Sequence, residues 1–236
     1  MSNKPPIEVP QGAIRFNTDS QKMEFFDGYK WYEMATEVIS LDGGNGRGEA
    51  AGGIDPSQID TIQYITIPTQ GNAIDFGNLT APTQGSLAAT GSSTRGLIGG
   101  GQRFPAQVNV IDLITFSSTG NAIDFADLTV ARGQLSGSGS QTRGIFGGGQ
   151  PGPSVVDTID YVTIASTGTN AVDFGNLTST RRMLTAASSP TRSLFFAGLN
   201  PSSTNVIDFI TISTTGNAQD FGDASVAMYS SGAVSS

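Results

Sequence analysis

A six-residue phrase returns four times along this chain at a nearly constant spacing. It reads GNAIDF twice, then TNAVDF, then GNAQDF, at 71–76, 120–125, 169–174 and 216–221. An Arg precedes each copy, and these Arg residues stand 48 or 49 residues apart, at Arg47, Arg95, Arg143 and Arg192. Self-similarity at a period of roughly 20–50 residues predicts a repeat architecture, in which each unit folds alike and packs on its neighbours.

Each unit contains four short segments whose composition favours strands and tight turns. The first begins at the Arg and ends in glycines, as in RGLIGGG at 95–101. The second alternates β-branched and aromatic residues, as in IDLITF at 111–116, and is the clearest strand. An Asp-Phe segment and a run of Ser, Gly and Ala, such as GQLSGSGS at 133–140, complete the unit. No stretch keeps a helical period over a useful length.

Four strands in a unit of this length are typical of a propeller blade. We therefore expect an all-β fold, a small four-bladed β-propeller with repeats near 47–94, 95–142, 143–191 and 192–236. The C-terminal SVAMYSSGAVSS aligns with the Ser/Gly/Ala segment that the first unit lacks. It is expected to lie antiparallel to RGEAAGG and close the ring, which removes exposed sheet edges. A flat β-solenoid, or a longer array in which this segment opens a fifth blade, are the alternatives.

The repeats resemble kelch-type repeats over roughly residues 43–236. The glycine runs Gly99–Gly101 and Gly147–Gly149 carry the resemblance, together with the Asn-x-x-x-aromatic pattern that starts at Asn205. The Trp near the end of a kelch unit is missing. Phenylalanines stand in the corresponding place of this sequence: Phe76, Phe125, Phe174 and Phe221.

Residues 1–40 differ from the repeats and are expected to form a separate β-hairpin module, with the propeller occupying 41–236. IRF, MEFF and KWYEM read as three short strands, separated by the turn signals NTDSQ and DG. So small a sheet is marginal alone. Its aromatic residues are therefore expected to attach the module to another chain: Phe25, Phe26, Trp31 and Tyr32.

The run GAIRFNT followed by EFFDG and KW, at 12–31, resembles a motif of tailed-phage virion proteins, especially fibres and appendages. The repeats are similar to those of structural proteins from phages of cyanobacteria. This resemblance implies a non-enzymatic virion component, assembled in the host cytoplasm as a symmetric homo-oligomer. It also implies other virion proteins as partners, with a host surface glycan or receptor as a further candidate.

Composition excludes several other classes of function. The chain has no Cys and no His, so thiolate, imidazole and Cys-based zinc chemistry are absent. The net charge of −8 disfavours nucleic acid as a partner. No apolar run is long enough for a membrane helix, and the N-terminus has no signal-peptide pattern. We expect no catalytic residue, no cofactor and no metal site. A surface lectin-like propeller is the main alternative function, followed by a glycan-degrading enzyme with two carboxylates.

Repeated charged residues are expected to serve the geometry of the units. One Asp ladder comprises Asp75, Asp124, Asp173 and Asp220, and a second comprises Asp112, Asp160 and Asp208, with Gln63 breaking the series. One carboxylate per unit gives widely separated ligands, so turn capping and pairing with Arg are expected before calcium binding. The glycine-rich 41–53 lacks the Lys and the helix of a phosphate loop.

The loops that vary between units are the expected binding face, because variation on a rigid scaffold is where recognition usually lies. QRFPAQVN (102–109), QPGPSVVD (150–157) and LNPSSTNV (199–206) join the first and second segments of three units. The opposite turns hardly change. Five residues at this face are the candidate contact residues: Arg103, Phe104, Arg132, Arg181 and Arg182.

Overall fold

The computed structural model describes residues 9–17, 22–33, 46–166 and 169–235. The chain divides into two compact units, Met1–Leu41 and Asp42–Ser236. Across the described ranges every regular element is a strand, so the fold is all-β with antiparallel sheets, as expected from the sequence. The described part of the chain has no helix that is long and apolar enough to cross a membrane.

The N-terminal unit contains one antiparallel sheet of three strands, β1 (Ile14–Asn17), β2 (Lys22–Phe26) and β3 (Trp31–Glu33). The turn between β2 and β3 is built by Asp27, whose carboxylate accepts the N–H groups of Tyr29 and Lys30 at 2.7 and 2.8 Å. Gly28 supplies the left-handed conformation that the turn requires, with φ of 101°. The Asp-Gly pair therefore sets the register in which Phe26 faces Trp31.

The second unit contains four sheets that follow the repeats, here named repeat sheets 1 to 4. Repeat sheet 1 has the order β4-β5-β6, with β4 (Arg47–Ala51), β5 (Thr61–Thr66) and β6 (Ile74–Asn78). Repeat sheet 2 is formed by β7 (Ala88–Gly91), β8 (Arg95–Gly99), β11 (Val110–Thr115) and β12 (Ile123–Asp127). Repeat sheet 3 is formed by β13 (Ser136–Gly139), β14 (Arg143–Gly147), β15 (Thr158–Thr163) and β16 (Val172–Asn176).

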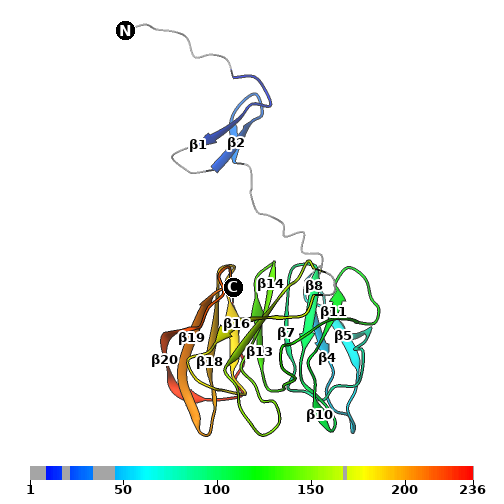
Figure 1. Ribbon diagram of the computed structural model, residues 1–236. Helices are drawn as coiled ribbons and strands as arrows, with labels where there is room; N and C mark the ends of the chain where they lie inside the picture. Colours follow the sequence, from blue (N-terminus) through cyan, green and yellow to red (C-terminus); the bar gives the residue numbers. More distant parts are fainter. Residues whose placement is uncertain (1–8, 18–21, 34–45, 167–168, 236) are drawn as a thin grey trace. The chain divides into compact units, whose positions relative to one another are not determined.

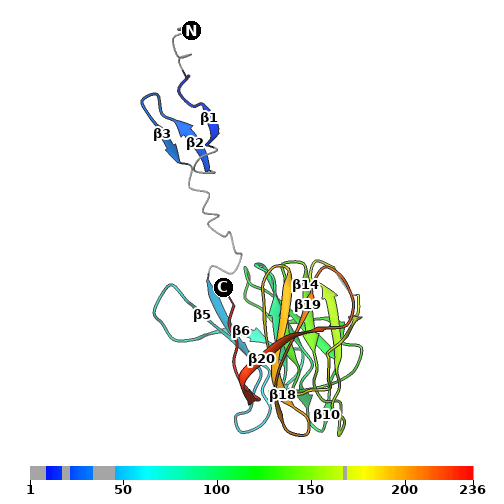
Figure 2. The same ribbon diagram turned by 90° about the vertical axis from the view of Figure 1, so that its left-hand side faces the viewer.

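Repeat sheet 4 is formed by β17 (Thr185–Ser188), β18 (Arg192–Leu199), β19 (Ser203–Thr211) and β20 (Gln219–Met228). A small hairpin of β9 (Gln102–Arg103) and β10 (Ala106–Gln107) projects from the connection between β8 and β11. Figures 1 and 2 show most strands of the second unit lying along a similar axis, while β20 crosses obliquely in Figure 2 and β10 of the hairpin lies at one end. The connections between strands therefore gather at the two ends of the sheets.

The hydrophobic core of the second unit lies between the sheets, in three clusters. Each cluster combines side chains from two consecutive repeat sheets: Phe76 of sheet 1 lies with Ile114 of sheet 2. In the same way Phe125 lies with Val162, and Phe174 with Ile210. A repeat sheet therefore cannot bury its apolar residues alone, which explains why the unit is repeated.

The strands rich in Ser, Gly and Ala lie side by side, because β13 contacts both β7 and β17. A Cβ atom on Gly137 would stand 2.3 Å from the backbone oxygen of Ala89, so this approach requires a glycine. The run of Ser, Gly and Ala in each of these repeats therefore has a packing role, because small residues let the strands lie close together. We call β7, β13 and β17 the inner strands.

The expected ring of four blades, closed by the C-terminal strand, is not what the structure shows. The described residues form six sheets and no closed propeller, and repeat sheet 1 has three strands because β4 pairs only with β5. Residues 224–228 instead prolong β20, and Met228 pairs with Thr204 of β19. The physical reason is the length of β19, whose nine residues extend the edge along which β20 continues.

Candidate binding surface

The Arg that opens each of the first three repeats binds the next repeat sheet. Arg47, Arg95 and Arg143 donate through Nη1 to the backbone oxygens of Phe116, Ile164 and Ile212. Two of these guanidinium groups also stack on a tyrosine of their own sheet, Arg47 at 4.5 Å from the Tyr64 ring and Arg143 at 4.6 Å from Tyr161. The repeated Arg is therefore part of the contact between sheets.

The Asp ladder on the central strands has the same role. A β-bulge follows the Ile at the same place in every central strand, for example between Ile159 and Asp160. Asp112, Asp160 and Asp208 are buried, and each accepts hydrogen bonds from a Thr of the preceding repeat, as Asp160 does from Thr129 Oγ1 at 2.6 Å. Sequence analysis did not single out these threonines, although Thr80, Thr129 and Thr178 recur at one offset in the repeat.

Three of the predicted contact residues, Arg103, Arg132 and Arg181, pair with these carboxylates. Arg132 is fully buried and donates to Asp160 at 2.7 Å, and Arg181 is almost as deeply buried and pairs with Asp208. Both lie inside the protein, not at the surface where a partner could reach them. A buried carboxylate needs a cation nearby, and the corresponding position of the first repeat holds Thr83 in place of an Arg.

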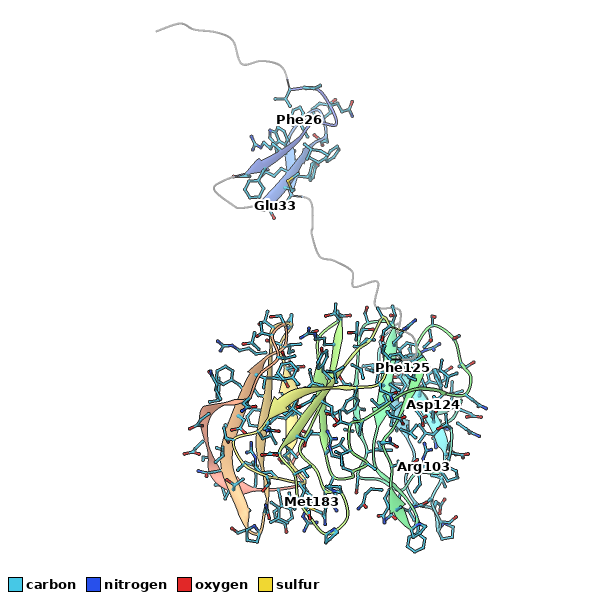
Figure 3. All side chains as sticks on the ribbon, in the orientation of Figure 1. Phe26, Glu33, Arg103, Asp124, Phe125 and Met183 are labelled. Carbon is cyan, nitrogen blue, oxygen red and sulfur yellow. The ribbon has the colours of Figure 1, made fainter. Side chains whose placement is uncertain are left out.

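Arg103 supplies that missing cation from the β9–β10 hairpin, where Figure 3 labels it. Its guanidinium donates to Thr83 Oγ1 at 3.0 Å and contacts Asp112 at 3.2 Å. Burial raises the pKa of the Asp112 carboxyl, while its bonds to Thr80 and the charge of Arg103 act in the opposite direction. Arg103 therefore anchors the hairpin with a side chain that is only partly exposed.

Arg182 is half-buried and links two loops at the same end of the sheets. Its Nη1 donates to the side-chain oxygens of Gln134 and Gln150, both at 2.8 Å. On the outer strands, Asp75, Asp173 and Asp220 each accept the N–H of the glycine two residues later, at 2.9 to 3.0 Å. Both residues of each bond lie within the strand and opposite its β-bulge, so these carboxylates stabilise the bulge and do not cap turns as expected.

Phe104 is the predicted contact residue that the structure places in solvent, with 77 % of its surface exposed. It lines a shallow groove of about 480 Å³ together with Ile54, Pro56 and Pro82. Gln58 holds the groove together, because its side chain accepts the N–H of Phe104 at 2.9 Å and donates to the Gln102 oxygen at 3.2 Å. Gln58 carries no repeat or motif signal, so sequence analysis missed it.

The predicted attachment residues of the N-terminal unit divide between the two faces of its sheet. Phe25 and Tyr32 lie on one face with Ile14, Phe16 and Met23, and all five are exposed. We call these five residues the open apolar face. Phe26 and Trp31 lie on the opposite face, with ring centres 5.2 Å apart, and Figure 3 labels Phe26 there.

The face that carries Phe26 and Trp31 is already covered by polar groups of the same sheet. The guanidinium of Arg15 lies 4.1 Å from the Trp31 ring and pairs with Glu24 at 2.7 Å. Hydrogen bonds from Asn17 and Arg15 lower the pKa of the Glu24 carboxyl. The pair Phe26 and Trp31 therefore stabilises the sheet. The open apolar face is exposed among the described residues, with Lys30 Nζ 4.6 Å from the Tyr32 ring.

No protein-family model matches this chain, and a search of curated proteins found no significant match.

Proposed function

We propose that this protein is a non-enzymatic structural component of a tailed-phage virion, with the repeats as a scaffold for binding. The use of the repeated charges carries this proposal. The central Asp residues pair with Arg residues where two sheets meet. They do not gather in a cleft where they could act on a substrate. The resemblance of residues 12–31 to fibre and appendage proteins supports the location in a virion.

The four repeat sheets are proposed to act as the blades of one small kelch-like propeller. Consecutive sheets share a core cluster, and the inner strands approach one another, which are the contacts that blades make around an axis. In this arrangement the variable loops form one rigid contact surface, with the exposed ring of Phe104 as its most prominent apolar group.

The open apolar face of the N-terminal sheet is the proposed attachment surface, and its partner is another virion protein. A three-stranded sheet with five exposed apolar side chains on one face is marginal alone. Burying that face on a neighbour removes these side chains from water at about 25 cal/mol for each Å². The proposed attachment surface is therefore one face of the sheet, and not the four aromatic residues that the sequence singled out.

Mass spectrometry of purified phage particles tests the proposal. We expect the protein in particles at a constant ratio to the major capsid protein, and its absence from particles would overturn the location. Phe25→Ser should reduce incorporation strongly, whereas Tyr29→Ser, at an exposed turn position, should leave it unchanged. Equal incorporation of both variants would rule out the open apolar face as the attachment surface.

A further inference from the structure

The edge of β4 that faces away from β5 has no strand beside it in the described part of the chain, and a cavity of about 370 Å³ lies next to it. Glu49, Ala51 and Ile62 of repeat sheet 1 line this cavity, together with residues of repeat sheet 2 from Leu87 to Gly91. In repeat sheets 2 to 4 an inner strand occupies the corresponding edge, paired with β8, β14 and β18. The cavity therefore marks the position of a missing fourth inner strand.

Glu49 shows that this position is incomplete. Its equivalents in the other repeats are the apolar residues Leu97, Ile145 and Leu194, of which the first two are fully buried. The Oε1 atom of Glu49 is buried and has no hydrogen-bond partner among the described residues, although the carboxyl lies against a cavity. An unsatisfied buried oxygen is destabilising, and it lies where the other repeats place an apolar side chain opposite an inner strand.

Ser230 carries the backbone features that precede each inner strand. Ser86, Gln134, Met183 and Ser230 share a positive φ between 53° and 71°, which is uncommon outside glycine. The N–H of Gln134 donates to the Ser86 oxygen, that of Met183 to Gln134, and that of Ser230 to Met183, at 2.7 to 2.9 Å. In each of the first three cases the inner strand begins two residues later.

We propose that Gly232–Ser235 is the fourth inner strand and that it docks antiparallel on β4 of the same chain. The repeat register places Gly232 opposite Ala51, Ala233 opposite Ala50, Val234 opposite Glu49 and Ser235 opposite Gly48. Val234 is 94 % exposed, and in this register its side chain enters the cavity beside Glu49. The inference rests on the blade arrangement proposed above, and adds the residues that pair, their register and the cavity that they fill.

The residues where repeat sheet 4 would meet repeat sheet 1 support this docking. At the three internal contacts a buried Asp faces an Arg, as Asp160 faces Arg132. At the fourth contact Gln63 stands in place of the Asp and Met228 in place of the Arg. Both charges are absent together, so the two sheets can meet without burying an unpaired charge.

The same chain is the expected source of the strand, because its own segment already lies beside the inner strands. Ser230 is held by its bond to Met183, and Ala233 and Ser235 line a cavity with residues of β7, β13 and β17. With Ser230 held in place, the five residues that follow it can extend over roughly 16 Å, at about 3.3 Å each. A second copy would have to supply its own segment across a free edge of β4.

Engineered disulfides test the register, since the chain has no Cys of its own. Residues directly opposite one another in antiparallel strands lie at Cα distances that suit a disulfide. The double variant Ala50→Cys/Ala233→Cys should oxidise to a monomer that loses about 2 Da in intact mass. Ala187→Cys/Ala233→Cys is the matched control, because both residues line the cavity at the inner strands.

Efficient crosslinking of the Ala50 pair within a monomer supports the docked strand. Crosslinking only between two copies assigns the strand to a second copy and overturns the proposal. Crosslinking of the Ala187 pair alone would show that the segment stays beside the inner strands and does not reach β4. This outcome would also overturn the proposal. Phage incorporation is measured separately, so failure here leaves the virion proposal standing.

Thermal unfolding gives a second readout that needs no crosslink. Val234→Ser should lower Tm by several degrees because it removes an apolar side chain from the cavity. Val172→Ser, on the exposed side of β16, should change Tm little. Equal and negligible shifts would mean that Val234 remains in solvent, which would contradict the docking.

Discussion

Single buried ion pairs hold consecutive repeat sheets together, and their two charges depend on one another. Arg132 donates to Asp160 at 2.7 Å and also to the Gly148 oxygen at 2.8 Å, in a site from which water is excluded. Such a pair contributes little net free energy over an apolar pair of similar volume. Removing one partner leaves a buried charge without compensation. It is therefore informative that Gln63 and Met228, at the equivalent positions, are both uncharged.

Arg132→Met should lower the free energy of unfolding by about 3–5 kcal/mol, because Asp160 then stays buried without its cation. The double variant Arg132→Met/Asp160→Asn should recover a large part of this loss, since no unpaired charge remains. Denaturant titrations of the wild type, both single variants and the double variant give the interaction energy. Additive losses in the four proteins would show that the two charges are not coupled.

Glu49 is a residue whose replacement should stabilise the protein. Burial raises the pKa of its carboxyl, an effect partly offset by the charge of Arg47. The stability linked to a raised pKa is present below the unfolded pKa and is lost as pH rises through the folded value. Glu49→Leu should therefore raise the free energy of unfolding at pH 7, by about 1 kcal/mol from apolar burial.

The advantage of Glu49→Leu should shrink as the pH is lowered to about 4, where the wild-type carboxyl takes up a proton. Denaturant titrations at both pH values measure the difference between the two proteins. If the difference in unfolding free energy between Glu49→Leu and the wild type does not change with pH, the Glu49 carboxyl is solvated and the prediction is wrong. Glu33→Leu, in the N-terminal sheet, provides a comparison outside the repeats.

At the scale of elements, the outer strand of one repeat sheet lies against a turn of the next. The N–H of Gly216 donates to the Phe174 oxygen at 2.7 Å, and that of Ala218 to Asn176 at 2.8 Å. Asn217 completes the contact by accepting the N–H of Asn176 at 3.1 Å. The phrase GNAIDF and its variants therefore recur because they form the joint between neighbouring sheets.

Gly175→Ala should disrupt such a joint, because a Cβ there would lie 2.4 Å from the Gly216 oxygen. The residue also has φ of 145°, so backbone strain adds to the clash. We expect a loss of more than about 2 kcal/mol in unfolding free energy. Gly216→Ala, at φ of 155° with no described atom within 4 Å of the added Cβ, isolates the strain and should cost about 1–3 kcal/mol without the clash.

At the scale of the whole molecule, the two end sheets of the repeat array present the faces that the internal sheets bury. Ala73 of repeat sheet 1 is exposed, whereas its equivalents Ala122, Ala171 and Ala218 are buried. Phe221 of repeat sheet 4 is 52 % exposed, although Phe174 is buried. These two faces are complementary, because surfaces of the same two kinds meet at each contact between consecutive repeat sheets.

Gly222→Ala tests whether these two faces meet. Gly222 occupies the position of Gly175 in its repeat, but no described atom lies within 4 Å of the point where an added Cβ would stand. If repeat sheets 4 and 1 join like the others, the Cβ would approach the Gly71 oxygen. We then expect a loss of stability as large as that of Gly175→Ala, whereas a loss matching Gly216→Ala would show that the joint stays open.

The repeat period, the alternation of the central strands and the turn residues are local signals, and they determined the all-β fold and the position of the strands. The exposure of Phe104 could also be predicted, because loops depend little on distant contacts. The burial of Arg132 and Arg181 could not be predicted in this way. An Arg side chain can lie in a solvated loop or in a buried ion pair, and the local sequence does not distinguish the two. Their burial depends on Asp160 and Asp208, which lie 28 and 27 residues further along the chain.

Two further outcomes were decided by tertiary structure. The cross-strand register separates Phe25 from Phe26, because neighbouring residues on a strand point to opposite faces of a sheet. The length of β19 allows β20 to continue to Met228, in competition with the path that the other repeats follow. A sequence specifies which strands can form, but the choice between two available edges depends on the free energy of the assembled sheets.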